Sequence, residues 1–348
     1  MIVTTVSGAR CAAASPGSRV ASSRSRPARG TGTVARSFNN NRRSDEGKSR
    51  RELLADLALS TICVGSAGAL DPTLAALAEE DLLPVKSLPK GAKASQAQEI
   101  YDLIQAAVRK NVTEDYTKIL QLAFLDAISY DKAGKTGGAN GSIVLFPDEL
   151  KALGLESSLG TAAKQVKQAR EDAQSASAFP LTLSVADVLY GAAFFKTRGK
   201  FVGDIIDKAK DQASANIILQ GYGNDFPMPP LGRVDASAPE AAALPSLKTT
   251  NLAERALSNG LITGQIVALS ACFPEGASRE QVEEEMKAFG GKFQFYVKSN
   301  QQSRSTLTQT NYQIDFGQGF FKLSTQGAKF DIERYYHPIP KVTKNVKL

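Results

Sequence analysis

The stretch that most constrains the fold is residues 119–143, where an apolar helical pattern is followed by a glycine-rich segment. Apolar residues recur there at three- and four-residue steps, which predicts a helix with one buried face. Four glycines follow between positions 134 and 141, and glycine both ends helices and permits tight turns. The sequence therefore predicts a central helix that ends in a tight loop. Its buried face is expected to hold Tyr116, Ile119, Leu120, Ala123, Phe124, Ala127 and Ile128.

The net charge of +7 is concentrated at one end of the chain. Residues 1–78 hold 11 basic and 5 acidic residues, whereas residues 79–348 hold 31 basic and 30 acidic residues. A protein that binds a phosphate backbone needs its basic surface on the folded part of the chain. The sequence therefore predicts no nucleic-acid partner.

The first 78 residues have the pattern of two targeting segments in series. Residues 1–50 are rich in Ser, Ala, Gly and Arg and contain only two acids, which is typical of an organellar transit peptide. Twin arginines then precede an apolar run and an A-L-A cleavage pattern, which indicates an export signal. A buried helix or a membrane anchor is the alternative, but the run is short and rich in Gly, Ser and Thr.

We therefore predict a chloroplast transit peptide at residues 1–50 and a twin-arginine export signal at residues 51–78. This order of signals predicts the thylakoid lumen as the location. The mature protein is expected to begin near Glu79 and to have no transmembrane span.

Rare residue types limit the chemistry of the mature chain. Of the three cysteines only Cys272 lies beyond the leader, so no internal disulfide can form there. Tryptophan is absent and His337 is the only histidine, for which a surface or structural role is expected. A Ser-His-Asp triad would have to use His337, and a Cys/His zinc site has too few ligands. We predict no metal site.

Periodicity and capping residues predict a mainly α-helical fold. Residues 79–94 are expected to form an extended lead-in and residues 221–245 a long loop. N-caps are expected at Ser95, Thr113, Ser184 and Ser278, with Asp187 closing a capping-box-like pair. Besides the central helix and a short one ending near residue 154, helices are expected at residues 95–110, 159–177, 184–195, 200–219, 261–270 and 279–289.

Beyond Gly290 the pattern changes. Aromatic and aliphatic residues alternate with polar ones, which predicts short strands or a partly extended arm. We interpret residues 290–348 as a divergent C-terminal arm. The alternating residues are Phe293, Phe295 and Val297, and then Tyr312, Ile314 and Phe316.

Three blocks in this order resemble the ascorbate peroxidases, which are class I haem peroxidases. The first block is LQLAFLDA at residues 120–127 with the loop TGGANGS at residues 136–142. The second is LSVAD at residues 183–187, and the third is LITGQIVALS at residues 261–270. A further loop, LGRVDA at residues 231–236, is also similar to the family. The resemblance implies a peroxidase-like helical domain over residues 95–289, with two subdomains that flank a haem cleft in active relatives.

The residues that perform the family's chemistry are replaced. Gln121 stands at the family's distal arginine, Phe124 at its tryptophan and Leu125 at its distal histidine. Phe273 stands at the histidine that ligates the haem iron, and Val282 at an ascorbate-binding arginine. Leucine cannot take a proton from peroxide, glutamine carries no charge to stabilise oxygen–oxygen cleavage, and phenylalanine cannot ligate iron. The resemblance therefore implies a degenerate relative that is not an enzyme and binds no cofactor, with its cleft narrowed or filled by side chains.

Two residues near these positions leave alternatives open. Cys272 precedes the lost ligand and could be a substitute haem ligand, although a buried structural cysteine is favoured. Asp126 follows the lost distal histidine and could cap the glycine loop or bind a cation, and the structural role is favoured.

The expected function is a non-catalytic protein of the thylakoid lumen, peripheral to the membrane. The resemblance implies association with photosystem II, or with another thylakoid membrane complex, from the lumen side, in a structural or photoprotective role. The aromatic segment at residues 290–336 is the predicted docking surface. The alternatives are a protein that binds ascorbate or another small reductant without haem, and, less favoured, a residual haem-dependent peroxidase.

Overall fold

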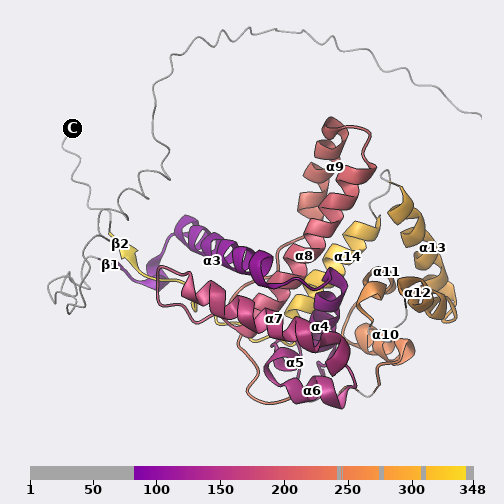
Figure 1. The fold of residues 1–348 in the computed structure, drawn as a ribbon, viewed down its shortest axis with the longest axis horizontal. Coiled ribbons are helices and arrows are strands. Elements are labelled where there is room, and N and C mark those ends of the chain that lie inside the picture. Colours follow the sequence, from indigo (N-terminus) through magenta and orange to yellow (C-terminus); the bar gives the residue numbers. More distant parts are fainter. Residues whose placement is uncertain (1–81, 241–243, 245, 274–277, 307–310, 342–348) are drawn as a thin grey trace, which may run out of the picture. The chain divides into compact units, whose positions relative to one another are not determined.

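Helices form nearly all the regular structure that the computed structural model describes (Figure 1). The described residues are 82–348, except 241–243, 245, 274–277, 307–310 and 342–348. Both predicted targeting segments lie outside them. Residues Asp71–Leu348 form one compact unit, which the following paragraphs describe.

The two ends of the described chain meet in a small antiparallel sheet. Strand β1 (Leu82–Leu83) pairs with β2 (Ile339–Pro340), with Leu83 opposite Ile339. The predicted lead-in is extended only in part, because it also contains the short 3₁₀ helix η2 (Val85–Ser87). The first long helix, α3 (Lys90–Asn111), begins directly after Pro89 and not at Ser95 as predicted.

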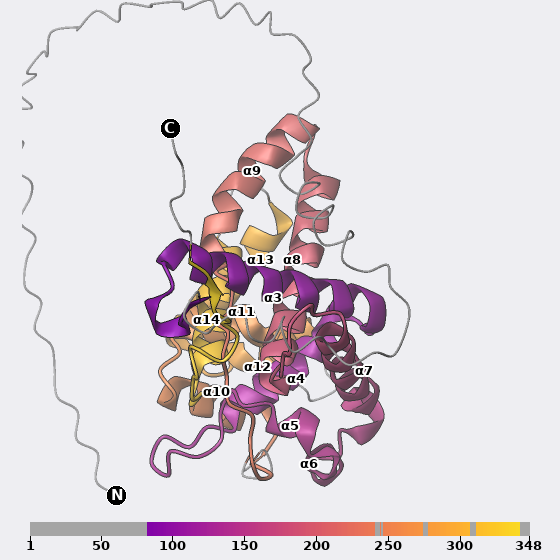
Figure 2. The same cartoon turned by 90° about the vertical axis from the view of Figure 1, so that its left-hand side faces the viewer.

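The predicted central helix is confirmed as α4 (Tyr116–Ile128). It packs against α7 (Glu156–Ser175) and α8 (Val185–Lys208), and nine of its residues are buried. Helix α3 also packs against α7 and α8, and Figure 2 shows it crossing above α4. The N-cap is Asp115 and not Thr113, since the Asp115 carboxylate accepts a hydrogen bond of 2.8 Å from the Thr117 backbone N–H.

The glycine loop after α4 packs closely against two segments that are distant in the sequence. Gly138 has φ +107°, and a Cβ atom there would lie 2.4 Å from the Gln326 carbonyl oxygen. Gly141 has φ +77°, and its Cβ would lie 2.9 Å from the backbone nitrogen of Ala186 at the start of α8. Only glycine fits these two positions without strain. The short helices α5 (Ser142–Leu145) and α6 (Pro147–Ala152) follow.

Helix α8 is longer than predicted, and the expected break between residues 195 and 200 is wrong. Phe194, Phe201 and Ile205 continue one buried face across that point, so packing holds the helix together despite Gly199 and Gly203. The next helix, α9 (Gln212–Asp225), extends into the segment predicted as a loop.

Three short elements follow, and the second and third of them hold most of residues 261–270. They are α10 (Thr249–Ser258), α11 (Thr263–Ala268) and the 3₁₀ helix η4 (Leu269–Cys272). Helix α12 (Arg279–Lys287) begins at Ser278, whose side chain and that of Gln281 form a capping box. The predicted caps at Ser278 and Ser184 are therefore confirmed, the latter by a hydrogen bond of 3.0 Å from the Asp187 N–H to the Ser184 Oγ.

The predicted strands in the C-terminal arm are wrong, because that region contains α13 (Gly291–Ser305) and α14 (Asn311–Thr325). Phe295 is 66% exposed whereas Val297 is fully buried, so the alternating residues do not share one face. Tyr312, Phe316 and Phe320 are four residues apart and share the buried face of α14. Helix α14 packs against α4, α9 and α11, so this segment is core and not a peripheral arm.

Candidate functional site

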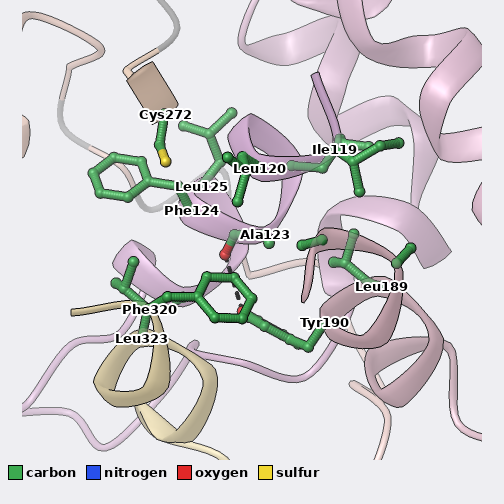
Figure 3. Packing of buried hydrophobic residues seen from close by; sticks show 14 of the residues in the cluster. Ile119, Leu120, Ala123, Phe124, Leu125, Leu189, Tyr190, Cys272, Phe320 and Leu323 are labelled. Atoms are coloured by element: carbon green, nitrogen blue, oxygen red, sulfur yellow. Dashed lines mark hydrogen bonds between the residues drawn. The ribbon is translucent and has the colours of Figure 1, made fainter. Parts of the chain in front are cut away.

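The two phenylalanines at predicted haem-site positions are in direct contact. Phe124 comes from α4, and Phe273 follows η4. Their ring centroids lie 4.8 Å apart, the rings are tilted by 33°, and each residue is 1% exposed. Figure 3 shows Phe124 and Leu125 close to Cys272 in this part of the core. Packed side chains therefore occupy these two positions.

The residues present at these positions do not fit haem. A planar group stacked between two rings needs contacts of about 3.5–4 Å on each side, or roughly 7–8 Å between the rings. The 4.8 Å separation leaves no such gap. Leu125 is fully buried, and the Gln121 side-chain amide donates a long hydrogen bond of 3.5 Å to the Phe273 carbonyl.

Cys272 is a buried thiol of the core. Burial raises the pKa of Cys272 to about 12, so the thiol keeps its proton near neutral pH. Metals bind the thiolate and not the thiol. The structure therefore favours the structural role of Cys272 over the role of substitute haem ligand.

Asp126 caps the glycine loop, as predicted. Its Oδ2 accepts hydrogen bonds from the Gly141 backbone N–H at 2.9 Å and from the Tyr190 hydroxyl at 3.1 Å. Its Oδ1 has no hydrogen-bond partner among the described residues. Burial raises the pKa of Asp126 to about 7, although the hydrogen bonds from Gly141 and Tyr190 act to lower it. Within the described ranges no group of three His, Cys, Asp or Glu residues could hold a metal, which does not support the cation alternative.

The remaining predicted positions are structural. Val282 is fully buried on α12, so its side chain faces the core. The His337 ring stacks on Phe179 with centroids 3.9 Å apart, and its backbone N–H donates to the Gln96 side chain at 3.2 Å. The structural role predicted for His337 is therefore confirmed.

A buried ion pair near the loop at residues 231–236 was missed by the sequence analysis. An Arg233 guanidinium nitrogen lies 2.8 Å from the Asp187 carboxylate, and both side chains are at most 1% exposed. The same carboxylate accepts from the Gly232 N–H at 2.8 Å and from the Tyr335 hydroxyl at 2.5 Å. Arg233 also donates to the Ser324 carbonyl at 2.6 Å. Asp187 therefore joins three segments and does not complete the predicted capping box.

A second polar cluster, which we call the Tyr312 cluster, was also missed. It consists of Arg279 on α12, Arg304 on α13 and Tyr312 on α14. The cluster borders a cavity of about 130 Å³ that Asp204 and Lys208 of α8 also line. The sequence prediction missed this cluster because it assigned Arg304 and Tyr312 to a separate arm, away from Arg279.

Similar proteins are known from chloroplasts. The thylakoid lumenal 29 kDa protein of Arabidopsis thaliana is 28% identical over 263 residues, which cover 71% of this chain and 72% of the relative. Its namesake from Solanum lycopersicum is 27% identical over 256 residues, 70% of each chain. The crystal structure of the TL29 protein from Arabidopsis thaliana matches with a TM-score of 0.59 and 26% identity, over 71% of this chain and 99% of that one. No protein-family pattern matches the chain.

The similarity agrees with the location predicted from the leader. Among the described residues no helix has the length and apolar character that crossing a membrane requires. The chain is a chloroplast protein of the thylakoid lumen.

Proposed function

We propose that this chain is a non-catalytic, peroxidase-like protein of the thylakoid lumen that associates peripherally with photosystem II in a structural or photoprotective role. The observation that carries the non-catalytic part is the contact between Phe124 and Phe273, with ring centroids 4.8 Å apart. A haem peroxidase needs an iron ligand at the position of Phe273 and a distal acid–base group at the position of Leu125, which is also fully buried. Here both are replaced by packed hydrocarbon.

The proposed partner rests on the resemblance and on the location. Peripheral association requires exposed side chains, and the segment first assigned to that role both exposes Phe295 and contributes to the core. Phe316 and Phe320 of α14 are buried, so deleting residues 290–348 would remove part of the core and not a separate arm. A test of docking must therefore use the whole chain.

The ascorbate-binding alternative has less support. The position expected to supply the binding arginine is Val282, which is fully buried. A calorimetric titration of the full chain with millimolar ascorbate tests this alternative, and we expect neither heat nor thermal stabilisation.

Haem binding tests the non-catalytic part of the proposal. The full chain is mixed with hemin, the excess is removed, and the visible spectrum is recorded beside a peroxide-turnover assay. An active ascorbate peroxidase stripped of haem and treated identically is the control. We expect no retained haem band and no turnover for this chain. A stoichiometric band would contradict the proposal, and Cys272→Ala and His337→Ala would then identify the ligand.

Co-sedimentation tests the proposed partner. The full chain is incubated with membranes enriched in photosystem II and, as the control, with membranes enriched in photosystem I. We expect saturable binding to the first preparation only. Equal binding to both preparations, or binding to neither, would contradict the proposed association.

A further inference from the structure

Two guanidinium groups lie close to the ring of Tyr312. The Cζ atom of Arg279 is 5.4 Å from the ring centroid, and the Cζ atom of Arg304 is 5.2 Å from it. Cations at such distances are attracted to the electron-rich face of an aromatic ring. These contacts hold both guanidinium groups near the ring, but they do not neutralise either positive charge.

Of these two arginines, only Arg304 forms an ion pair with another described residue. Arg304 forms a bidentate pair with the buried carboxylate of Glu283, at 2.6 and 3.0 Å. Glu283 also accepts from the Gln301 side-chain amide at 2.9 Å. Such a fork-to-fork pair balances the charge of the Arg304 guanidinium group and fixes its orientation. Arg304 is therefore a rigid part of the Tyr312 cluster.

Arg279 lacks such a partner. In the part of the chain that the structure describes, no carboxylate lies within ion-pair distance of Arg279, and its buried Nε has no hydrogen-bond acceptor. The Tyr312 hydroxyl likewise has no partner there, although the residue is only 2% exposed. Burial raises the pKa of Tyr312 to about 12, so the hydroxyl keeps its proton and can donate it. Buried donors without acceptors are rare, and an ion or water that completes them is the usual explanation.

The cavity beside these donors suits a small anion. Its volume is about 130 Å³, and it is bordered by Arg279, Arg304, Tyr312 and Lys208. Lys208 is held in place by a hydrogen bond of 2.7 Å from its Nζ to the Arg304 carbonyl. The acid on the cavity wall, Asp204, is paired with Lys200 at 2.5 Å. The uncompensated charge facing the cavity is therefore positive.

We propose that the Tyr312 cluster is a binding site for a small oxyanion, a phosphate or a carboxylate, with Arg279 as the principal binding residue and the Tyr312 hydroxyl as a second donor. The guanidinium group matches the geometry of either anion because it offers parallel N–H donors. Arg304 and Glu283 hold the ring and do not bind the anion directly. This proposal does not depend on the proposed partner.

Calorimetry and thermal unfolding of the full chain test the proposal. The chain is titrated with inorganic phosphate, with malonate and with chloride at constant ionic strength. We expect saturable binding of phosphate or malonate, with an increase in Tm, and no such effect of chloride. Comparing phosphate with malonate decides which oxyanion the site prefers.

Variants assign the binding to this cavity. Arg279→Gln is expected to weaken the affinity about tenfold or more, since a lost hydrogen bond to a charged group typically has that effect. Tyr312→Phe keeps the ring and is expected to weaken binding by a smaller factor. Arg109→Gln, at an exposed arginine of α3 that does not border the cavity, is the control and should bind as the wild type does. The Tm of each variant without anion reports whether it is folded.

Two outcomes would overturn the proposal. One is the absence of any anion-specific binding by the wild type, which would mean that water satisfies the donors. The other is equal weakening in Arg279→Gln and Arg109→Gln, which would mean that anions bind the surface without a specific site. If Arg279→Gln does not fold, Arg279→Lys keeps the positive charge and loses the paired donors, and unchanged affinity in that variant would also overturn it.

Discussion

At the scale of single residues, the carboxyl group of Asp126, which caps the glycine loop, has an unusually high pKa. The carboxylate is buried because it must reach the Gly141 N–H beneath the glycine loop. Burial penalises the charged form and raises the pKa to about 7, far above the ordinary value of 3.8. One side chain therefore makes the stability of the whole unit dependent on pH.

The sign of this dependence follows from proton binding. Between about pH 4 and pH 7 the folded state keeps the proton of Asp126 and the unfolded state has lost it. The free energy of unfolding therefore falls as the pH rises through this window, and it is highest on the acidic side. One group contributes at most about 1.4 kcal/mol per pH unit. From pH 5 to pH 7 the loss through Asp126 is expected to be about 2 kcal/mol.

Asp126→Asn should remove this dependence. We expect denaturant unfolding between pH 5 and pH 8 to show a flatter stability profile for the variant than for the wild type. Asp172→Asn is the matched control, because Asp172 is at the surface and its pKa is lowered to about 2 by hydrogen bonds from Lys110, Asn111 and Gln168, outside this pH range. Parallel profiles for Asp126→Asn and the wild type would refute the assignment.

At the scale of elements, the pair formed by Asp187 and Arg233 connects α8 to three segments that follow it in the chain. Asp187 lies in the first turn of α8, and Arg233 lies in the loop after α9 and reaches the carbonyl of Ser324 on α14. Asp187 also accepts from the Tyr335 hydroxyl near the end of the described chain. Four segments therefore meet at this buried ion pair.

Asp187→Asn leaves the Arg233 charge buried without its counter-charge. Breaking a buried pair in this way typically costs about 3–5 kcal/mol. We expect a loss of that size in denaturant unfolding. Asp204→Asn is the control, because it breaks the exposed pair between Asp204 and Lys200, and exposed pairs contribute about 0–1 kcal/mol. Similar losses in the two variants would contradict the role of the buried network.

At the scale of the whole molecule, the C-terminal helices complete the core. Helix α14 contributes Tyr312, Phe316 and Phe320 to an aromatic group that also includes Phe201 and Phe226. The Tyr312–Phe316 and Phe316–Phe320 pairs lie along one face of the helix. Strand β2 lies still later in the chain and pairs with β1 at its beginning. Folding of the unit therefore needs residues from both ends.

Truncation after Phe289 tests this dependence. The shortened chain loses α13, α14 and β2 and exposes the apolar residues that they cover, so we expect no cooperative thermal unfolding by circular dichroism. A chain that ends at Lys341 keeps all described elements and is the control. A cooperative transition in the shorter chain would show that residues 290–348 are a separate arm after all.

Sequence alone determined what depends on neighbours a few positions apart. The burial of α4 follows from three- and four-residue spacing, and the caps at Ser184 and Ser278 follow from the contact between a cap and the third residue of its helix. The glycine loop was predicted because glycine alone tolerates its backbone angles. The same local reasoning failed for α13 and α14, where short alternation concealed the four-residue spacing of Tyr312, Phe316 and Phe320.

Only the tertiary structure decided which distant residues meet. The Asp187–Arg233 pair joins positions 46 residues apart, and the Gln121–Phe273 hydrogen bond joins positions 152 apart. The rings of Phe124 and Phe273 and the arginines around Tyr312 likewise come from separate segments of the chain. Such contacts depend on how helices pack, and the pattern within each helix is compatible with many packings. The sequence pattern predicted part of the buried face of α4, and packing determined what each buried side chain contacts.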